Sequence, residues 1–216
     1  MSAGSSLVYS TNPRSWTDAN GAGYVVKGPE PEVVIAEAVA YELAAVVGLP
    51  TPGYALAKKP NDPRIYFASH KLENCARNVV PWLDGASDAH ARAVSELITF
   101  DIWIANEDRN LGGFLGVGSA DSLSLRFIDF EKSIALRGPA PLIATGGQEL
   151  YGLCKRMNVS PGAFVARISA ISDDAIKACV GSVCARVPEF DWSDSVEICL
   201  TRRRAKLATL VKEVWL

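Results

Sequence analysis

Three stretches of the sequence carry side chains whose types suit chemistry on a phosphate. Lys27 ends the apolar run Tyr-Val-Val-Lys, Asp108 lies in a polar loop behind a long apolar stretch, and Asp129 follows the short run Phe-Ile. Phosphoryl transfer needs a cation to hold the phosphates, carboxylates to hold magnesium, and a carboxylate to receive a hydroxyl proton. These three residues are of the required types and stand in a consistent chain order, so the pattern favours phosphoryl transfer.

Taken one at a time, these residues are weak signals. A lysine at the end of a strand is usually solvated, and a lone aspartate in a loop is more often a turn or helix-cap residue than a catalyst. Asp129 alone is not specific, because Phe-Ile-Asp-Phe also describes a strand that ends in a polar residue. The combination of all three, at spacings that suit two lobes, is what indicates a functional site.

The first third of the chain predicts a mixed β and α region. Residues 5–27 contain short β-branched and aromatic runs around Asn20-Gly21, a strong hairpin signal, and predict a small antiparallel sheet. Residues 32–47 show apolar positions at helical spacing and are followed by Gly48, a helix stop. Two further strands are expected at residues 53–57 and 65–68.

The rest of the chain is predicted to be mainly helical. Residues 86–104 predict a long amphipathic helix, and residues 105–131 predict a hairpin-like insertion with polar residues at its ends. Such a hairpin would return Asp108 and Asp129 to one cleft. Further helices are expected at residues 161–170, 173–183 and 193–215. The fold class that follows is α+β and two-lobed, with a small β-rich lobe over residues 1–72 and a mainly helical lobe over residues 73–216.

In this order of parts the chain resembles the compact HipA-like kinase family, whose members share the protein-kinase-like fold. The resemblance extends from about residue 7 to the C-terminal helix with its Arg202-Arg203-Arg204 cluster, and so covers most of the chain. Its most telling parts are the Asp-Arg-Asn loop and the Gly-Leu-Pro-x-Pro segment. The matching segments are Tyr-Val-Val-Lys, Ala36-Glu37, Leu43-Ala44, Gly48-Leu49-Pro50-Thr51-Pro52, Phe-Asp-Ile-Trp-Ile-Ala-Asn-Glu-Asp-Arg-Asn and Ile-Asp-Phe-Glu.

The resemblance implies a role for each matching residue. Lys27 would contact the α- and β-phosphates of ATP, and Glu37 would pair with this lysine. Asp108 would be the catalytic base and Asp129 the magnesium ligand. Glu42 is an alternative partner for Lys27, but it lies on a different side of the helix from Glu37, so both cannot serve.

The loop after the catalytic base carries further expectations and one departure. Arg109 and Asn110 would belong to the nucleotide site, with Arg109 holding the loop, and residues 67–72 would be either a hinge near adenine or an ordinary connection between lobes. The family usually has a second metal-binding Asn five residues after the base, where this chain has Gly113. Glycine offers no side-chain oxygen. Either Asn110 or water fills that position, or the domain transfers phosphate slowly or not at all.

The composition indicates which kinds of partner the chain is not expected to bind. Lys and Arg number 22 against 24 Asp and Glu, so there is no charge excess that points to nucleic acid or to an anionic membrane. We also expect no signal peptide and no membrane span. The five cysteines are irregularly spaced without a Cys-x-x-Cys pair, which disfavours a zinc site and fits a reducing cytoplasm.

The leading hypothesis is therefore a cytoplasmic serine/threonine-protein kinase that uses ATP and magnesium, its protein substrate being implied by the family resemblance alone. The alternative is a pseudokinase that binds a nucleotide or a protein partner, in a toxin–antitoxin, phage or defence context, with weak phosphotransfer or none. Gly113 favours this alternative, whereas the trio of Lys27, Asp108 and Asp129 favours the enzyme. Phosphorylation of a small molecule or a lipid would use the same site.

Overall fold

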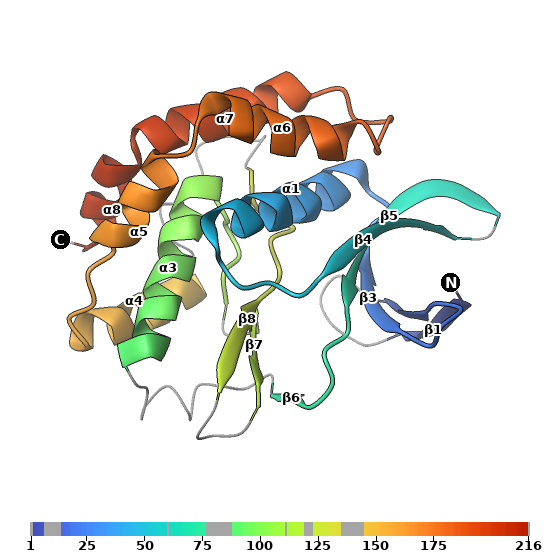
Figure 1. Cartoon of the computed structure of the whole chain (residues 1–216), viewed down its shortest axis with the longest axis horizontal. Helices are drawn as coiled ribbons and strands as arrows, with labels where there is room; N and C mark the ends of the chain where they lie inside the picture. The colour runs from blue at the N-terminus through green and yellow to red at the C-terminus, as the bar shows by residue number, and fades with distance from the viewer. Residues whose placement is uncertain are drawn as a thin grey trace.

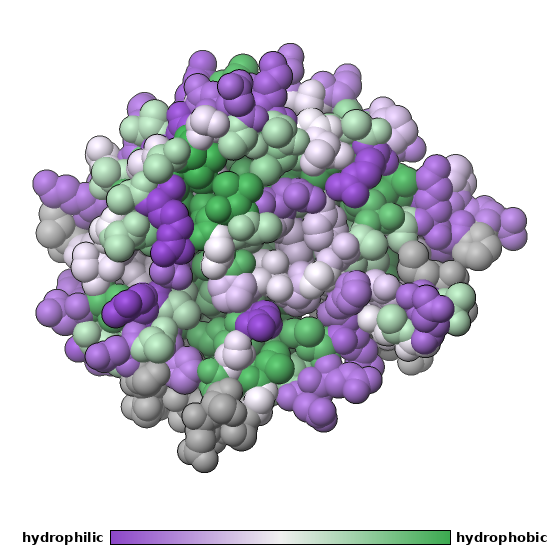
Figure 2. Space-filling view, viewed as in Figure 1, coloured by the Kyte–Doolittle hydropathy of each residue, from purple (hydrophilic) through white to green (hydrophobic). Residues whose placement is uncertain are grey.

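The computed structural model describes residues 2–6, 14–59, 61–76, 88–110, 112–118, 123–134 and 145–215. Strands gather at one end of the molecule and most helices at the other, and helix α1 crosses between the two groups (Figure 1). On the same face, hydrophilic side chains dominate the periphery, and hydrophobic side chains gather around α1 (Figure 2). The α+β, two-lobed class expected from the sequence is the fold observed.

The sheet of the first lobe has the strand order β1-β2-β3-β5-β4, with antiparallel neighbours throughout. In this sheet Lys27 lies directly opposite Phe67, so both side chains share one sheet face because side chains alternate along a strand. The opposite face buries the small cluster around Trp16 and Tyr66. The strands are β1 (Ser2–Ser6), β2 (Arg14–Thr17), β3 (Gly23–Lys27), β4 (Tyr54–Lys59) and β5 (Asp62–His70).

Helix α1 (Pro31–Val47) packs against β5 on one side and against α6 on the other. Proline at its first turn suits the helix start, because the amide that proline lacks has no partner inside the helix there. At its end Gly48 adopts a left-handed conformation, with φ of 69°. The Leu49 and Gly48 amides donate to the carbonyls of Ala44 and Ala45, which forms a Schellman motif. Both ends of the helix are therefore encoded locally.

The second lobe begins with a small sheet in the order β6-β7-β8 and with the long helix α3. Trp103 of α3 is fully buried, and its indole donates to the carbonyl of Leu200 in α7. The main core joins α1, α3 and the C-terminal helices in one apolar cluster. The elements are β6 (Cys75–Ala76), α3 (Asp88–Ile104), β7 (Phe114–Val117), β8 (Ser124–Phe127), α4 (Thr145–Arg156), α5 (Gly162–Ser169), α6 (Asp173–Cys184), α7 (Ser193–Ala205) and α8 (Leu207–Trp215).

The helices expected at residues 32–47, 86–104, 161–170 and 173–183 are confirmed within a residue or two over the described residues. The single helix expected over residues 193–215 is wrong, because the chain turns at Lys206 and divides it into α7 and α8. This turn lets both Leu207 and Val211 enter the core. Helix α4 was not anticipated, since two glycines in its first turn weaken the helical signal. The apolar run at residues 7–9 lies outside the described residues.

Candidate active site

Lys27 lies at the centre of the site, at the end of β3 and on the sheet face that α1 covers. Its ammonium nitrogen Nζ is 2.5 Å from Oε1 of Glu37 and 2.5 Å from Oδ1 of Asp129. Oε2 of Glu131 is 3.2 Å from the same nitrogen. We call these four residues the Lys27 cluster. It joins residues that are about a hundred positions apart in the sequence, and it joins the two lobes.

Glu37 is the fully buried member of the cluster and comes from the middle of α1. Its Oε1 atom also accepts a hydrogen bond of 3.0 Å from the Phe130 amide, whereas its Oε2 atom is buried and has no hydrogen-bond partner. Burial raises the pKa of Glu37 above its ordinary value, although Lys27 opposes the rise. Glu42 does not take this place, because its carboxylate accepts a hydrogen bond from the Tyr54 hydroxyl.

The Lys27 cluster sets one ammonium group against three carboxyl groups. Burial by itself would lower the pKa of Lys27, but the nearby carboxylates of Glu37, Asp129 and Glu131 outweigh burial and raise it. Lys27 is therefore cationic at neutral pH. With all three carboxyl groups ionised the cluster would carry two net negative charges, which attracts a further cation.

Carboxylate oxygens of Glu37, Asp129 and Glu131 all lie within 4.8 Å of one another. Oxygen ligands are what magnesium prefers, and magnesium usually keeps several waters and takes one or two carboxylates. Buried oxygens of Glu37 and Glu131 lack hydrogen-bond partners, and the Asp129 side chain is about one-third exposed. The residues thus fit a divalent cation, with Asp129 as the accessible ligand.

Asp108 lies in the loop that follows α3. Helix α3 ends in a Schellman arrangement, in which Ala105 adopts a positive φ of 56° and the Asn106 amide donates to the Asp101 carbonyl. The Asp108 amide then donates to the side-chain oxygen of Asn106 at 3.3 Å. The Asp108 side chain is left exposed. An exposed carboxylate on a tethered loop is suited to meet a group that arrives from solvent.

Arg109 follows Asp108 but points into the protein. Its guanidinium is buried and donates from Nε and Nη2 to the two carboxylate oxygens of Asp101, at 2.7 and 3.0 Å. Its Nη1 atom donates to the carbonyls of Gly113 and Ile128, at 2.8 and 2.6 Å. Four of its five donors are thereby used within the protein. Arg109 is placed to brace the loop against the backbone just before Asp129.

Asn110 is also engaged within the loop. Its amide nitrogen donates to the Asp108 carbonyl at 3.1 Å, and its side-chain oxygen accepts from the Gly112 amide at 2.8 Å. Metal binding by Asn110 would require the second of these contacts to open.

Gly113 has a steric role that the sequence did not reveal. A Cβ atom added at this position would lie 2.1 Å from Nη1 of Arg109 and 3.1 Å from the Asn110 carbonyl oxygen. Any other residue would displace the buried guanidinium or the loop. The inward position of the Arg109 side chain therefore requires glycine at position 113, where the family usually has Asn.

Asp129 itself has a left-handed backbone, with φ of 69°, a conformation that aspartate tolerates better than most residues. On its N-terminal side the Ile128 amide donates to the Gly113 carbonyl at 2.9 Å. The Asp129 carbonyl oxygen accepts a hydrogen bond of 3.4 Å from the side-chain amide nitrogen of Asn106. These contacts tie the loop of Asp108 to the segment of Asp129.

Sequence reasoning missed three members of this arrangement: Asp101, Asn106 and Glu131. Asp101 had a usable signal, because an acidic residue within the apolar run Phe-Asp-Ile-Trp-Ile needs a buried partner. Asn106 and Glu131 had no such signal in the sequence, because their roles depend on contacts with distant segments. The expected adenine hinge at residues 67–72 begins with Phe67, which is buried against Tyr41 and Tyr54.

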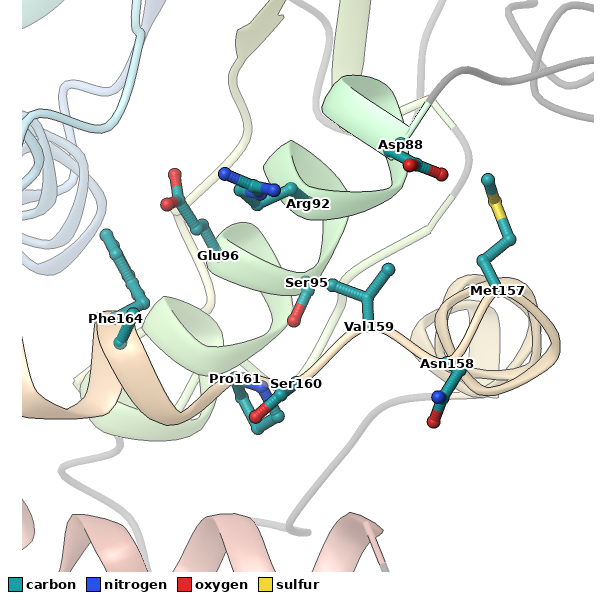
Figure 3. A pocket seen from close by; sticks show the side chains of 11 residues that line it. Asp88, Arg92, Ser95, Glu96, Met157, Asn158, Val159, Ser160, Pro161 and Phe164 are labelled. Carbon is teal, nitrogen blue, oxygen red and sulfur yellow. The ribbon is translucent and has the colours of Figure 1, made fainter.

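A separate cavity of about 350 Å³ lies between α3 and the segment that joins α4 to α5 (Figure 3). Ser95 of α3 points toward Val159 and Ser160, and Arg92 and Glu96 of the same helix also line the cavity. No member of the Lys27 cluster lines this cavity.

The two lobes, with a lysine and its acidic partners held between them, define a kinase-like protein. A profile of the HipA-like kinase family matches residues 8–119, about half of the chain, and the chain belongs to this family. No curated protein matches it in sequence.

Solved structures agree on the fold. The proinflammatory kinase CtkA of Helicobacter pylori superposes with a TM-score of 0.66 at 13% identity, over 94% of each chain. HipA of Shewanella oneidensis MR-1, in a complex with HipB and operator DNA, superposes with a TM-score of 0.59 at 9% identity. That match covers 96% of this chain and 64% of HipA, so the chain spans just under two thirds of that protein. Within the described residues, the helices lack the length and apolar character needed to cross a bilayer.

Proposed function

We propose that this chain is an ATP- and magnesium-dependent kinase that transfers the γ-phosphate of ATP to a serine or threonine hydroxyl of a protein. The observation that carries the proposal is the Lys27 cluster, in which one lysine contacts both the α1 glutamate and the carboxylate of Asp129. The nucleotide would bind between a lobe of residues 1–72 and a lobe of residues 73–216. The free cysteines and the use of ATP are consistent with a cytoplasmic enzyme.

In this proposal each residue acts through its position. Lys27 neutralises the nucleotide phosphates while Glu37 fixes the direction of its side chain. Asp129, with Glu131 behind it, would hold magnesium, which when bound neutralises charge on the phosphates. Arg109 would act on the nucleotide site by holding the loop, and Asn110 would contribute only after leaving its contact with Gly112.

The reaction itself needs one further group. The acceptor oxygen bonds to the γ-phosphorus as the bond from that phosphorus to the β–γ bridging oxygen breaks, and ADP departs. The proton of the acceptor hydroxyl passes to the Asp108 carboxylate. Because Asp108 is exposed, a hydroxyl on another protein can reach it.

The decisive experiment is calorimetric titration of ATP, with and without magnesium, into the wild type and into Asp129→Ala. We expect magnesium-dependent binding that the substitution abolishes. A parallel incubation with γ-labelled ATP and bacterial lysate protein should then yield labelled phosphoserine or phosphothreonine. Absence of nucleotide binding in both conditions would refute the proposal.

A second candidate function, a nucleotide-binding pseudokinase that engages a protein partner, is favoured by Gly113. No side chain fits there without moving Arg109, so the second metal-binding Asn of the family has no direct substitute at this position. Magnesium-dependent ATP binding without any labelled product would select this candidate.

A further inference from the structure

A second cavity, of about 370 Å³, adjoins the Lys27 cluster. It lies between the first turn of α1, the segment 131–134 that follows Asp129, and the start of α7. We call it the α1–α7 cavity. Neither Lys27 nor Asp129 lines it, but Glu131 of the Lys27 cluster does, so the cavity adjoins the phosphate site and shares one residue with it.

The α1–α7 cavity is connected to the site through two of its lining residues. Glu107 lines it and directly precedes Asp108 in the chain. Glu131 lines it as well, and its Oε2 atom lies 3.2 Å from the Lys27 ammonium. A molecule bound in the cavity is therefore held next to the loop of Asp108 and beside the cluster expected to hold the phosphates.

The charged residues that line the cavity are mainly negative. Its ionisable lining residues are four glutamates and a single lysine, namely Glu30, Glu32, Glu107, Glu131 and Lys132. The Glu131 side chain is only 5% exposed, and its Oε2 atom is ion-paired with Lys27 at 3.2 Å but accepts no hydrogen bond. A buried carboxylate oxygen without a hydrogen bond is costly. The cavity is thus suited to a ligand that brings a cationic hydrogen-bond donor.

Apolar and aromatic residues also line the cavity. Trp192 is 48% exposed, which is unusual for so large a hydrophobic side chain, and it contacts Phe190 with ring centroids 5.8 Å apart. Val33, which is partly exposed, adds aliphatic surface. A guanidinium stacks on an aromatic face, and the methylene stem of arginine packs on aliphatic surface. Acidic groups and an exposed tryptophan in one cavity therefore match an arginine side chain.

We infer that the α1–α7 cavity binds an arginine side chain of the protein acceptor and so presents a neighbouring serine or threonine to Asp108. The inference rests on the proposed kinase function and deepens it by naming the acceptor class: a basic segment, with arginine near the phosphorylated hydroxyl. Arginine rather than lysine is expected, because its planar fork both stacks on Trp192 and donates to several carboxylates.

The test separates acceptor binding from phosphotransfer. Two fluorescein-labelled serine peptides, identical except that arginine is replaced by norleucine, are titrated with the full chain while anisotropy is measured, in the presence of ADP and magnesium. We expect the arginine peptide to bind about 5- to 30-fold more tightly. Equal affinity of the two peptides, or no binding of either, would overturn the inference.

Variants then locate the binding site. Glu32→Lys reverses an exposed charge on the cavity rim, and Trp192→Ala removes the aromatic face. Each should reduce the preference for arginine at least threefold and leave the affinity for ATP unchanged. Glu213→Lys, the same charge reversal at an exposed residue of α8 outside the cavity lining, is the matched control for Glu32→Lys and should have no effect. A preference for arginine that survives both cavity variants would place peptide binding elsewhere.

Failure of this inference and failure of the proposed function give different results. If ATP does not bind, the kinase proposal fails, and the peptide titration can still be read without nucleotide. If ATP binds and phosphate is transferred equally well to both peptides, the kinase proposal stands and the arginine site is wrong.

Discussion

Two charged clusters meet at residues 128 and 129, and they differ in what they leave unsatisfied. In the first, Arg109 pairs with Asp101 and donates to the Ile128 carbonyl, so that all but one of its donors are used. In the second, Lys27 faces three carboxyl groups, and buried oxygens of two of them have no hydrogen bond. In the first cluster nearly all hydrogen-bond donors of the arginine are used, whereas in the second some carboxylate oxygens accept no hydrogen bond.

This difference separates a cluster that supports the fold from one whose charge and unused acceptors suit a further cation. A saturated buried ion pair holds its backbone in one position, since opening it would leave a bare charge. An excess of carboxylates around one lysine leaves net negative charge, which a further cation or protonation of Glu37 would reduce. Substitutions in the Arg109 cluster should therefore change stability, and substitutions around Lys27 and Asp108 should change binding or turnover.

The largest effect is expected from Asp108→Asn. Asparagine keeps the shape of the side chain but cannot take the acceptor proton, so phosphotransfer should fall by about 10²- to 10⁴-fold. Because Asp108 is exposed, urea unfolding and calorimetric ATP affinity should match those of the wild type. Turnover within threefold of the wild type, measured with labelled ATP, would remove Asp108 from the mechanism.

Arg109→Met should give the largest loss of stability. The substitution leaves the Asp101 carboxylate buried without its partner, which costs about 3–5 kcal/mol. Urea unfolding followed by circular dichroism measures the loss. Arg64→Met is the matched control, because Arg64 pairs with Asp62 on the surface and its side chain is 60% exposed. The comparison breaks down if both arginine variants unfold at the same urea concentration.

Gly113→Ala should destabilise the protein by about 1–3 kcal/mol, because the new methyl group overlaps the guanidinium of Arg109. Gly181→Ala is its control: a Cβ atom there, in α6, meets nothing within 4 Å, and alanine should stabilise the helix. For the same steric reason Gly113→Asn should not raise turnover. A gain of activity in Gly113→Asn would mean that Arg109 is free to move aside.

The smallest effect concerns pH and Glu37. Because its pKa is raised in the folded protein, Glu37 contributes stability below its unfolded pKa of about 4.3 and loses it as pH rises through the folded value. The stability of the wild type minus that of Glu37→Gln should therefore decrease as pH rises above about 4.3. Urea titrations between pH 4 and pH 7 measure this slope. Glu42→Gln, on the same helix, is the control, and an equal slope there would contradict the assignment.

Much of the fold was predictable, because its signals are local. The hairpin at Asn20-Gly21, the helix that ends at Gly48 and the apolar face of α3 all follow from short-range patterns, and each element formed as expected. Predictions were wrong or incomplete where tertiary packing decides, as at Lys206, where the chain turns so that Leu207 and Val211 reach the core.

For the candidate site, the sequence by itself determined which groups are available: Lys27, Asp108 and Asp129, whose types suit phosphoryl transfer. Only the tertiary structure decided how they are used. In the folded chain Glu37, rather than Glu42, pairs with Lys27, and Glu131 lies beside the same lysine. Arg109 points inward and pairs with Asp101. The physical reason is that electrostatic energy depends on distance and burial, and these are set by contacts between segments far apart in the chain.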